Sequence, residues 1–529
     1  MSSYRNYSSK YLQFEKNYRK KKWKDRLSIA LVFPNYYHLG MSNLGFLTVY
    51  QNLNSYSEIV CERVFLMDTN NQPLSVESQR PLEDFDIILF SISFEPDFVN
   101  LLKILINSKI EIFAKKRKKI ILAGGIGVWL NPVPLSKFID GFILAEWEAI
   151  EKDFVPVLLN HFNNKKELLH VLNTHSFFYA PEIDREKIAK IKKTKEFFNP
   201  AFSEILSKKA EFADTYLVEV GRGCGRGCRF CFAGFVYRPP RMPDISLLFE
   251  KIERIPPSSK VGLVGLEFAD KKEIIKLGEK LLKKDCQLSF SSLRIDALSE
   301  EFLELLKHTR SVAIAPETGS NRLKKVINKV ITEEEVMETL IKFEKKGVKN
   351  VKFYFMLGLP GENEKDVKET IEFIKKILKK KFRLNFQFSF SFFVPKPHTP
   401  FQWAEFKEES YLKKMEKAIK KELGFVKNVK TDSYRYALMQ VLIGRGNEFT
   451  GDFLLHLAQK GSLKRGLKLI KNLNEILQPE EKIDTTFSWE KVDTGVRKEY
   501  LWKEWQKSKK AEVTGFCKPG ICKVCGACS

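Results

Sequence analysis

The sequence has no long apolar run. No stretch approaches the roughly 18 uncharged apolar residues that a membrane-spanning helix needs. The N-terminal residues also lack the apolar segment of a secretory signal. Cysteine is scarce, with nine among 529 residues, and all but Cys61 and Cys286 fall in two short clusters. Clustered cysteines indicate metal centres in a reducing compartment rather than a disulfide framework. We therefore expect a cytoplasmic protein without a membrane span.

Acidic residues are too few to balance the basic ones. The chain has 66 Asp and Glu against 90 Lys and Arg, which gives a formal net charge of +24. Such a surplus favours polyanionic partners such as RNA, because phosphate contacts release counterions. A lysine-rich proteome, in which lysine coats every helix, gives the same surplus. The composition leaves both interpretations open.

The first cysteine cluster lies in a glycine-rich loop that follows an apolar run. Cys224, Cys228 and Cys231 stand at C-x-x-x-C-x-x-C spacing, and Phe230 precedes the last of them. Three thiolates can hold three irons of a cubane 4Fe–4S cluster and leave the fourth iron without a protein ligand. A structural zinc needs four ligands, and the neighbouring sequence supplies no fourth. The loop therefore predicts a 4Fe–4S cluster with one open iron, shielded on one face by Phe230.

The second cluster ends the chain. Cys517, Cys522, Cys525 and Cys528 form a C-x(4)-C-x(2)-C-x(2)-C pattern. Four thiolates complete the ligand set of either a structural zinc or a second 4Fe–4S cluster. A second 4Fe–4S cluster is favoured over zinc, because the first cysteine loop already requires iron–sulfur cluster assembly. A tail with unligated, redox-labile thiols is the remaining alternative.

The N-terminal part alternates short apolar segments with helical patterns. Segments rich in Val and Ile are typical of buried strands. The predicted strands span residues 27–33, 59–65, 87–93, 120–123 and 141–144. Alternating strands and helices predict a doubly wound, Rossmann-like parallel sheet with ligands at the carboxyl ends of its strands. The charged segment 165–198 is predicted to be a linker.

A second alternating series follows the linker. Its predicted strands span residues 216–220, 261–266, 288–293, 312–315, 351–357 and 386–394. Six strand–helix repeats predict an open, partial (β/α)6 barrel with its chemistry at the carboxyl ends of the strands. Beyond a proline-rich exit the pattern is mainly helical, with helices expected at 408–423, 434–444, 453–460 and 463–477.

These patterns divide the chain into five segments. The N-terminal segment is basic and is predicted to be either a solvated arm or a nucleic-acid contact. The predicted segments are a basic arm (1–26), a Rossmann-like domain with its linker (27–198), the barrel (205–405), a helical region (406–510) and a cysteine-rich tail (511–529).

Taken together, the motifs resemble the radical S-adenosylmethionine (SAM) superfamily, in the subgroup with an N-terminal cobalamin-binding-like domain. Beside the cysteine loop, the resemblance rests on Ala123-Gly-Gly, Ala315-Pro-Glu-Thr-Gly-Ser320, Tyr354-Phe-Met-Leu-Gly-Leu-Pro-Gly361 and the stretch from Phe393 to Trp403. It covers nearly the whole chain. The resemblance implies that the amino and carboxylate groups of SAM chelate the open iron. Reductive cleavage would then give methionine and a 5′-deoxyadenosyl radical, with electrons from a donor such as ferredoxin or flavodoxin.

The resemblance also implies roles for residues at the strand ends. Gly265, Leu266 and Glu267 correspond to a Gly-Gly-Glu strand end that contacts the SAM amino group, and Leu266 departs from that pattern. The segment Gly358 to Gly361 is expected beneath the adenine. Candidates for contacts to the ribose and carboxylate of SAM are Arg294, Glu317, Ser320 and Arg322.

Cobalamin is a further cofactor that the resemblance raises. Corrinoid domains with a histidine ligand carry D-x-H-x-x-G after the first strand, whereas this chain reads Tyr36-Tyr-His38-Leu-Gly40. The aspartate is absent and the glycine spacing differs, so His38 is expected to be an ordinary loop histidine. Cobalamin bound without a histidine ligand and a domain that has lost the cofactor both stay open.

Three functions are consistent with the sequence. The first is a radical SAM enzyme that transfers a methyl group or sulfur to a macromolecule, RNA before others. The second is a radical SAM enzyme acting on a small-molecule metabolite. The third is a non-catalytic iron–sulfur or RNA-binding protein, against which the intact cysteine triad argues. The sequence indicates no catalytic residue beyond those expected to bind the cofactors.

Overall fold

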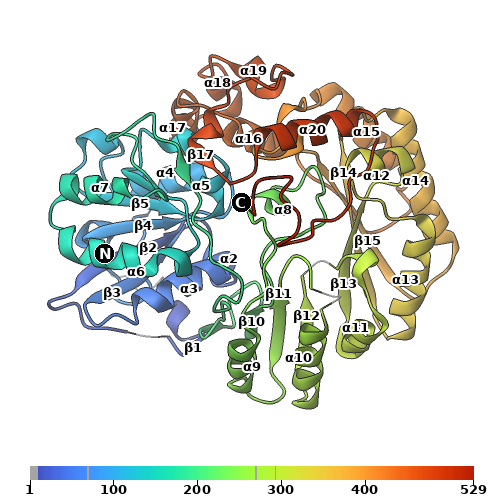
Figure 1. The fold of residues 1–529 in the computed structure, drawn as a ribbon, viewed down its shortest axis with the longest axis horizontal. Helices are drawn as coiled ribbons and strands as arrows, with labels where there is room; N and C mark the ends of the chain where they lie inside the picture. Colours follow the sequence, from blue (N-terminus) through green and yellow to red (C-terminus); the bar gives the residue numbers. More distant parts are fainter. Residues whose placement is uncertain (1–9, 19, 68–70, 269–270, 292, 529) are drawn as a thin grey trace.

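The computed structural model describes residues 10–18, 20–67, 71–268, 271–291 and 293–528. Figure 1 shows a blue-to-cyan sheet domain on one side, green and yellow strand–helix units below and opposite it, and orange-to-red helices across the top. The C-terminus lies near the middle of this arrangement. In the described part of the chain, no helix is long and apolar enough to cross a membrane.

The N-terminal domain is a doubly wound sheet, as predicted. Its strand order is β3-β2-β4-β5-β6-β7, and all neighbours are parallel except β6 and β7. Every residue of β2 and β3 is buried, which is expected when helices cover both faces of a parallel sheet. The strands are β2 (Leu27–Phe33), β3 (Ile59–Phe65), β4 (Ile87–Ser91), β5 (Ile120–Gly124), β6 (Gly141–Ile143) and β7 (Phe178–Tyr179), and the main helices are α3 (Leu44–Leu53), α4 (Asp97–Asn107) and α6 (Trp147–His161).

The segment predicted as a linker is ordered structure. It forms helix α7 (Lys165–Thr174), strand β7 at the edge of the sheet, and β8 (Ala189–Lys190), which pairs with β17 (Val492–Asp493). Leu168, Leu169 and Leu172 of α7 are buried in the domain core. The linker prediction was wrong because charged residues dominate the exposed face of α7 and mask its apolar face.

The described part of the basic N-terminal segment also packs on this domain. Strand β1 (Glu15–Lys16) pairs with β9 (Leu206–Ser207), and the Glu15 carboxylate accepts from the buried Arg63 guanidinium at 2.8 Å. Trp23 Nε1 donates to Glu62 at 2.7 Å. The segment is therefore no free arm over residues 10–18 and 20–26, and residues 1–9 lie outside the described part.

The barrel consists of two parallel sheets rather than one. The first has the order β10-β11-β12 and the second β13-β14-β15-β16. A bridge between Leu293 and Ile314 joins them. The sheets separate because the chain leaves strand geometry after Phe290 and β13 carries a register shift. The strands are β10 (Thr215–Glu219), β11 (Lys260–Val264), β12 (Gln287–Phe290), β13 (Ser311–Glu317), β14 (Asn350–Leu357), β15 (Asn385–Phe392) and β16 (Val429–Thr431).

Helices α9 (Ile245–Glu253), α10 (Lys272–Lys283), α11 (Glu300–Glu304), α12 (Asn321–Val326), α13 (Glu333–Lys345) and α14 (Glu364–Lys379) connect these strands. The six strands predicted for the barrel are all present. The seventh, β16, comes from the region predicted to be helical and is too short to leave a sequence pattern.

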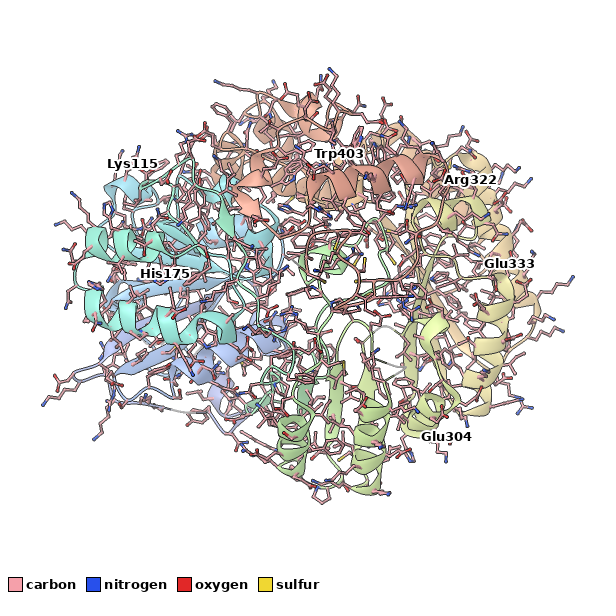
Figure 2. The ribbon with its side chains drawn as sticks, viewed as in Figure 1. Lys115, His175, Glu304, Arg322, Glu333 and Trp403 are labelled. Atoms are coloured by element: carbon pink, nitrogen blue, oxygen red, sulfur yellow. The ribbon has the colours of Figure 1, made fainter. Side chains whose placement is uncertain are left out.

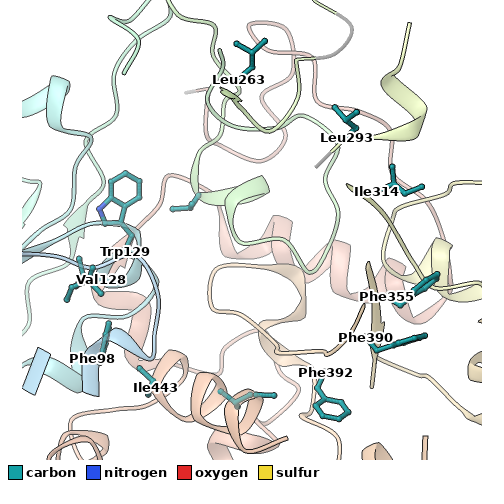
Figure 3. Packing of buried hydrophobic residues seen from close by; sticks show 14 of the residues in the cluster. Phe98, Val128, Trp129, Leu263, Leu293, Ile314, Phe355, Phe390, Phe392 and Ile443 are labelled. Atoms are coloured by element: carbon teal, nitrogen blue, oxygen red, sulfur yellow. The ribbon is translucent and has the colours of Figure 1, made fainter. Parts of the chain in front are cut away.

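The C-terminal helices join the N-terminal domain to the barrel. Asn131 Nδ2 donates to the carbonyls of Gly444 and Gly446 at the end of α16, at 3.1 and 2.7 Å. Figure 3 shows Phe98, Val128 and Trp129 beside Ile443, within one buried apolar cluster that continues into the barrel. The helices are α15 (Glu409–Glu422), α16 (Tyr434–Gly444), α17 (Thr450–Ala458), α18 (Leu463–Leu467), α19 (Leu473–Leu477) and α20 (Lys498–Lys509). The helix predicted over 463–477 is thus broken into α18 and α19.

Candidate active site

The cysteine loop follows β10 at the carboxyl end of the barrel. Backbone hydrogen bonds in both directions between Arg222 and Arg241 fasten its start, at 2.9 and 2.7 Å. Gly223 has φ +86°, and a Cβ there would lie 2.7 Å from the Tyr237 carbonyl oxygen. Gly227 likewise has φ +71°. Only glycine fits these turns, so the loop conformation depends on Gly223 and Gly227.

The three thiols of the loop lie in one largely buried environment. Burial raises the pKa of Cys224 to about 12, with Glu267 and Cys228 adding to the rise. Burial and the neighbouring Cys228 raise the pKa of Cys231 to about 11. Arg294 Nη1 lies 3.3 Å from Cys228 Sγ. A metal centre must therefore displace thiol protons as it binds, and Arg294 is placed to offset the thiolate charge.

The chemistry of this donor set fits an iron–sulfur cluster. Among the described residues, no three His, Cys, Asp or Glu side chains converge on a position for one metal ion. A cubane binds each thiolate through a different iron, so its ligands do not meet at one point. Three thiols at the spacing of this loop, with one adjacent guanidinium, are the residues that would hold such a cluster.

A charged network connects the loop to the next strand ends. Gly225 N donates to Glu267 Oε2 at 2.8 Å, and Arg226 forms an ion pair with the same carboxylate. Asp296 accepts from Arg294 at 2.9 Å and from Arg226 at 3.3 Å. The structure thus brings Glu267 and Arg294 to the cysteines. The Glu267 carboxylate is engaged by the loop itself, and its contact with the SAM amino group stays a prediction.

The other two residues of that strand end lie close by. The Gly265 carbonyl accepts from Ser291 Oγ at 2.7 Å, and a Cβ on Gly265 would lie 2.9 Å from the Phe268 ring. Leu266, the departure from the family pattern, is 41% exposed. The side chain of Leu266 is therefore accessible where the resemblance expects glycine.

The residues expected at the fourth barrel strand divide into two groups. Glu317, with φ +67°, forms a buried ion pair with Lys329 at 2.7 Å. Glu317 raises the pKa of Cys231 and Lys329 lowers it. Ser320 is fully buried, caps α12 and donates to Asp366 at 2.6 Å. Arg322, on α12 in Figure 2, donates to the Gly361 carbonyl at 2.8 Å. Glu317 lies beside the cysteines, whereas Ser320 and Arg322 organise the loop after β14.

Sequence reasoning missed Glu362, which completes the Gly358–Gly361 turn. Its carboxylate accepts from Gly358 N at 2.7 Å and from Tyr411 Oη at 3.3 Å. Gly358 and Gly361 both have positive φ, +85° and +72°. The sequence does show an acidic residue directly after Gly-Leu-Pro-Gly, where its carboxylate can accept a hydrogen bond from a backbone amide of the turn.

Replacing Glu362 by Gln is expected to stabilise the fold above neutral pH. Burial raises the pKa of Glu362 from 4.5 to about 7, so its charged form is disfavoured in the folded state. The wild type therefore loses stability as pH rises from about 4.5 to 7, by about 3 kcal/mol in total. The Gln variant keeps an acceptor for Gly358 N and avoids this loss. Unfolding free energies at pH 5 and pH 8 test this, and an equal difference between the proteins at both values would contradict it.

A cavity of about 290 Å³ lies where the domains meet. This volume is near the lower end of the range for pockets that hold drug-sized ligands. Phe230 of the cysteine loop, the ends of β14 and β15, α16, and the loop after β4 form its walls. Burial raises the pKa of Asp432 in this wall. The lining residues are mostly apolar, namely Phe94, Phe230, Met356, Phe392, Phe393, Val394, Ala437 and Tyr436, with Ser391, Lys396, Asp432 and Gln440 as the polar members.

The crevice at which a doubly wound sheet binds ligands lies between the loops after β2 and β4. Here protein groups bond across it: Asn35 Nδ2 donates to Asp97 at 2.8 Å and Asn43 Nδ2 to Ser93 Oγ at 3.0 Å. The His38 ring stacks on Tyr36, with centroids 6.0 Å apart. Whether the domain binds cobalamin without a histidine ligand or has lost the cofactor stays open, and the absorbance spectrum of the purified protein tests it.

The cysteine tail lies against the first cysteine loop. Cys517 N donates to the Gly225 carbonyl at 2.7 Å, and the carbonyl of the buried Cys525 accepts from Arg497 N at 2.8 Å. A turn at Gly520, with φ +76°, brings Cys522 N within 2.9 Å of the Lys518 carbonyl. Burial raises the pKa of Cys517, and Cys522, Cys525 and Cys528 add to that rise. Cys522, Cys525 and Cys528 thus lie close enough to Cys517 to influence its charge.

Comparison with known proteins places the chain in a family. Residues 45–181 match the family described as radical SAM proteins, N-terminal, and residues 218–374 match the Radical SAM superfamily. This protein therefore belongs to the radical SAM superfamily and is an enzyme of that class. Within the superfamily it is a relative of the uncharacterized protein MJ0966 of Methanocaldococcus jannaschii. The two are 30% identical over 457 residues, which cover 85% of this chain and 96% of MJ0966.

More distant relatives have named activities. The threonylcarbamoyladenosine tRNA methylthiotransferase MtaB of Aquifex aeolicus is 24% identical over 50% of this chain and 63% of its own length. The ribosomal protein uS12 methylthiotransferase RimO of Petrotoga mobilis is 27% identical over 45% of this chain and 63% of its own. Among solved structures, the radical SAM methyltransferase TsrM of Kitasatospora setae aligns over 71% of this chain and 75% of its own, with 12% identity and a TM-score of 0.48. That score supports no inference about activity.

Proposed function

We propose that this enzyme cleaves SAM reductively at the cysteine loop and uses the resulting radical to transfer a methyl group or sulfur to RNA. The observation that carries the first part is that the loop with the three thiols also contributes Phe230 to the wall of a cavity. When bound, the 4Fe–4S cluster supplies the electron that cleaves SAM into methionine and a 5′-deoxyadenosyl radical.

The chain's own residues position and shield the reactants. We place the adenosyl group of SAM in the cavity, where Phe230, Met356 and Phe393 exclude water and restrict its orientation. Arg294 offsets the charge on Cys228, and the ion pair of Glu317 with Lys329 sets the charge beside Cys231. These groups hold the reacting atoms in place rather than entering the reaction themselves.

Two observations support RNA as the substrate. The net charge of +24 favours a polyanion. A distant relative, MtaB, is named as a tRNA methylthiotransferase, although another, RimO, is named for a ribosomal protein. A small-molecule substrate is the second candidate, favoured by the modest size of the cavity.

Binding of RNA is expected to weaken steeply with salt. If the protein makes about six or more phosphate contacts, its affinity should fall by about a thousandfold between 50 and 200 mM salt. Fluorescence anisotropy of labelled tRNA measures this, with heparin as the matched polyanion. Equal and weak binding of tRNA and heparin, with no effect of tRNA on SAM cleavage, would contradict an RNA substrate and favour the small-molecule alternative.

The experiment that tests the function uses the full chain, reconstituted with iron and sulfide without oxygen. With dithionite, it should release 5′-deoxyadenosine from SAM. Mass spectrometry of nucleosides from a strain that lacks the protein should reveal a missing modification, which the purified protein restores on that RNA. SAM cleavage accompanied by an unchanged nucleoside profile would instead direct the search to metabolites.

A further inference from the structure

The tail and the SAM-binding loop form one packed unit. Asn328 bonds to both: its Nδ2 donates to the carbonyls of Gly227 and Thr514, at 3.2 and 3.1 Å, and its Oδ1 accepts from Thr514 N at 2.8 Å. The Arg226 guanidinium lies 4.1 Å above the Phe516 ring. In Figure 1 the red end of the chain lies beside α8 (Ala233–Val236), the helix that directly follows the cysteine loop.

The tail contacts the first cysteine loop where Cys517 packs against Gly225. A Cβ built on Gly225 would lie 3.5 Å from Cys517 Cβ and 3.4 Å from its carbonyl oxygen. Gly225 follows Cys224 directly, so the first tail cysteine and the first loop cysteine are held on adjoining backbone segments. Two metal centres held by these two sets would therefore be neighbours.

Two basic side chains, the buried Arg238 and the partly buried Lys193, lie on the inner side of the tail. Arg238 is 3% exposed, and its guanidinium donates to Tyr500 Oη at 3.2 Å. Lys193 Nζ donates to the carbonyls of Arg238 and Thr494, at 2.9 and 2.8 Å. A cubane with four thiolates carries net negative charge, which needs compensation in a buried site. Arg238 and Lys193 supply that compensation, and the need is greatest when the cluster is reduced, because it then carries one more negative charge than an oxidised cluster or a zinc with four thiolates.

The outer side of the tail is apolar and basic. Ile521 is 80% exposed, Val524 62% and Phe516 62%, and the neighbouring Lys518 and Lys523 are also exposed. Exposed apolar side chains rimmed by one sign of charge are typical of a protein-docking surface. The positive charge matches an acidic partner. We call these five residues the tail patch.

We infer that the cysteine tail holds a fully ligated 4Fe–4S cluster and is the port through which electrons reach the SAM-binding loop from a small, acidic electron-carrier protein that docks on the tail patch. This inference rests on the proposed function. In the transfer the carrier loses one electron and the tail centre gains it, then returns to its oxidised state as it reduces the neighbouring centre. No bond forms or breaks, and no proton is needed. Because all four tail thiols are ligands, no iron stays open for substrate.

The first test reverses charge on the tail patch without touching a ligand. Lys518→Glu with Lys523→Glu is expected to raise the concentration of reduced flavodoxin, an acidic one-electron carrier, needed for half-maximal 5′-deoxyadenosine release by about tenfold. Iron content and the dithionite-driven rate should stay unchanged. Stopped-flow absorbance of flavodoxin oxidation gives a readout independent of turnover. The matched control is Lys379→Glu with Lys380→Glu, two exposed lysines at the end of α14, which should behave as wild type.

The second test replaces Cys517, Cys522, Cys525 and Cys528 by serine in the full chain. Iron should fall from about eight to about four per chain, by the stoichiometry of two cubanes. Dithionite should still drive SAM cleavage, whereas flavodoxin should no longer do so. Stoichiometric zinc in the wild type with iron unchanged in the variant would overturn the inference, as would undiminished flavodoxin-driven turnover. A variant that accepts electrons from flavodoxin but forms no product would make the tail a substrate site or sulfur donor instead.

The two failures are distinguishable. Absence of dithionite-driven SAM cleavage in the wild type would contradict the proposed function, while the iron counts and the rate of flavodoxin oxidation would still report on the tail. If the serine variant does not fold, the charge-reversal pair decides: an unchanged dependence on flavodoxin, with iron near eight per chain by cubane stoichiometry, would overturn the docking surface.

Discussion

Replacing Cys224, Cys228 and Cys231 together by alanine is expected to reduce SAM cleavage to the background of a sample without protein. These thiols are the ligands that the loop supplies to the cluster, so the variant should lose about four irons per chain by cubane stoichiometry. Without the cluster, SAM has neither an iron to chelate nor an electron to accept. Chromatography of 5′-deoxyadenosine measures the loss. Electron paramagnetic resonance should show that the signal changed by SAM in the wild type is gone.

Cys286→Ala is the matched control for this triple variant. Cys286 is 2% exposed and packs at the start of β12, away from the loop. Its removal deletes a buried thiol and should change stability slightly, but iron content and SAM cleavage should be retained. SAM cleavage at wild-type rates in the triple variant would mean that the loop is not the cluster site and would remove the basis of the proposed function.

The N-terminal sheet was predictable because its strands are buried on both faces. The runs that form β2 and β3 are continuously apolar apart from a few polar residues, and their bounds agree with the prediction. Helix α16 was likewise predicted with its bounds, and the six barrel strands agreed to within a few residues. Local patterns of apolar residues carried this information, since each element buries a contiguous face.

Elements that depend on distant partners were not predictable. Strand β16 has three residues and exists through pairing with β15. Strand β7 is only two residues long and joins the sheet antiparallel to β6, within the segment read as a linker. The N-terminal segment packs through Glu15, whose partner Arg63 lies far along the chain. No local pattern reports such long-range pairing. The charged composition of the segments with β7 and Glu15 suggested a linker and an arm, and the region of β16 was predicted to be helical.

The candidate site likewise contains residues that local sequence predicts and residues that depend on distant partners. The cysteine spacing predicts which thiols act together as ligands, and the structure leaves that assignment a prediction. Ser320 was expected to face SAM, yet it caps α12 and is fully buried, and its position just before a helix was the signal for a cap. Asn328, which fastens the loop to the tail, had no signal at all, since its hydrogen bonds reach residues remote in sequence.

Replacing Arg229 by methionine is expected to release the tail from the cysteine loop. The Arg229 side chain is fully buried and donates to Glu504 at 3.0 Å, to the Lys325 and Val326 carbonyls at 3.0 Å, and to the Glu512 carbonyl at 2.8 Å. Methionine fills much of the volume but removes all of these bonds. Glu504 keeps Thr514 and Lys507 as donors, whereas the Val326 and Glu512 carbonyls lose the guanidinium. Breaking a buried ion pair in this way costs about 3–5 kcal/mol. Amide hydrogen exchange in the tail should therefore speed up by about two to four orders of magnitude, which mass spectrometry of the 510–528 peptide measures.

Two further variants show whether the ion pair itself causes the effect. Arg254→Met removes an exposed pair with Glu250 and should change exchange little, because exposed pairs contribute about 0–1 kcal/mol. Glu504→Gln combined with Arg229→Met removes both buried charges, so the tail should be better protected than the sum of the single effects predicts. If the effects of the two substitutions on exchange are strictly additive, the lost protection comes from the carbonyls that Arg229 no longer contacts rather than from the ion pair. In either case the cysteine loop and the tail should loosen together, because Arg229 stands next to Cys228 in the chain and bonds to the backbone that leads into Cys517.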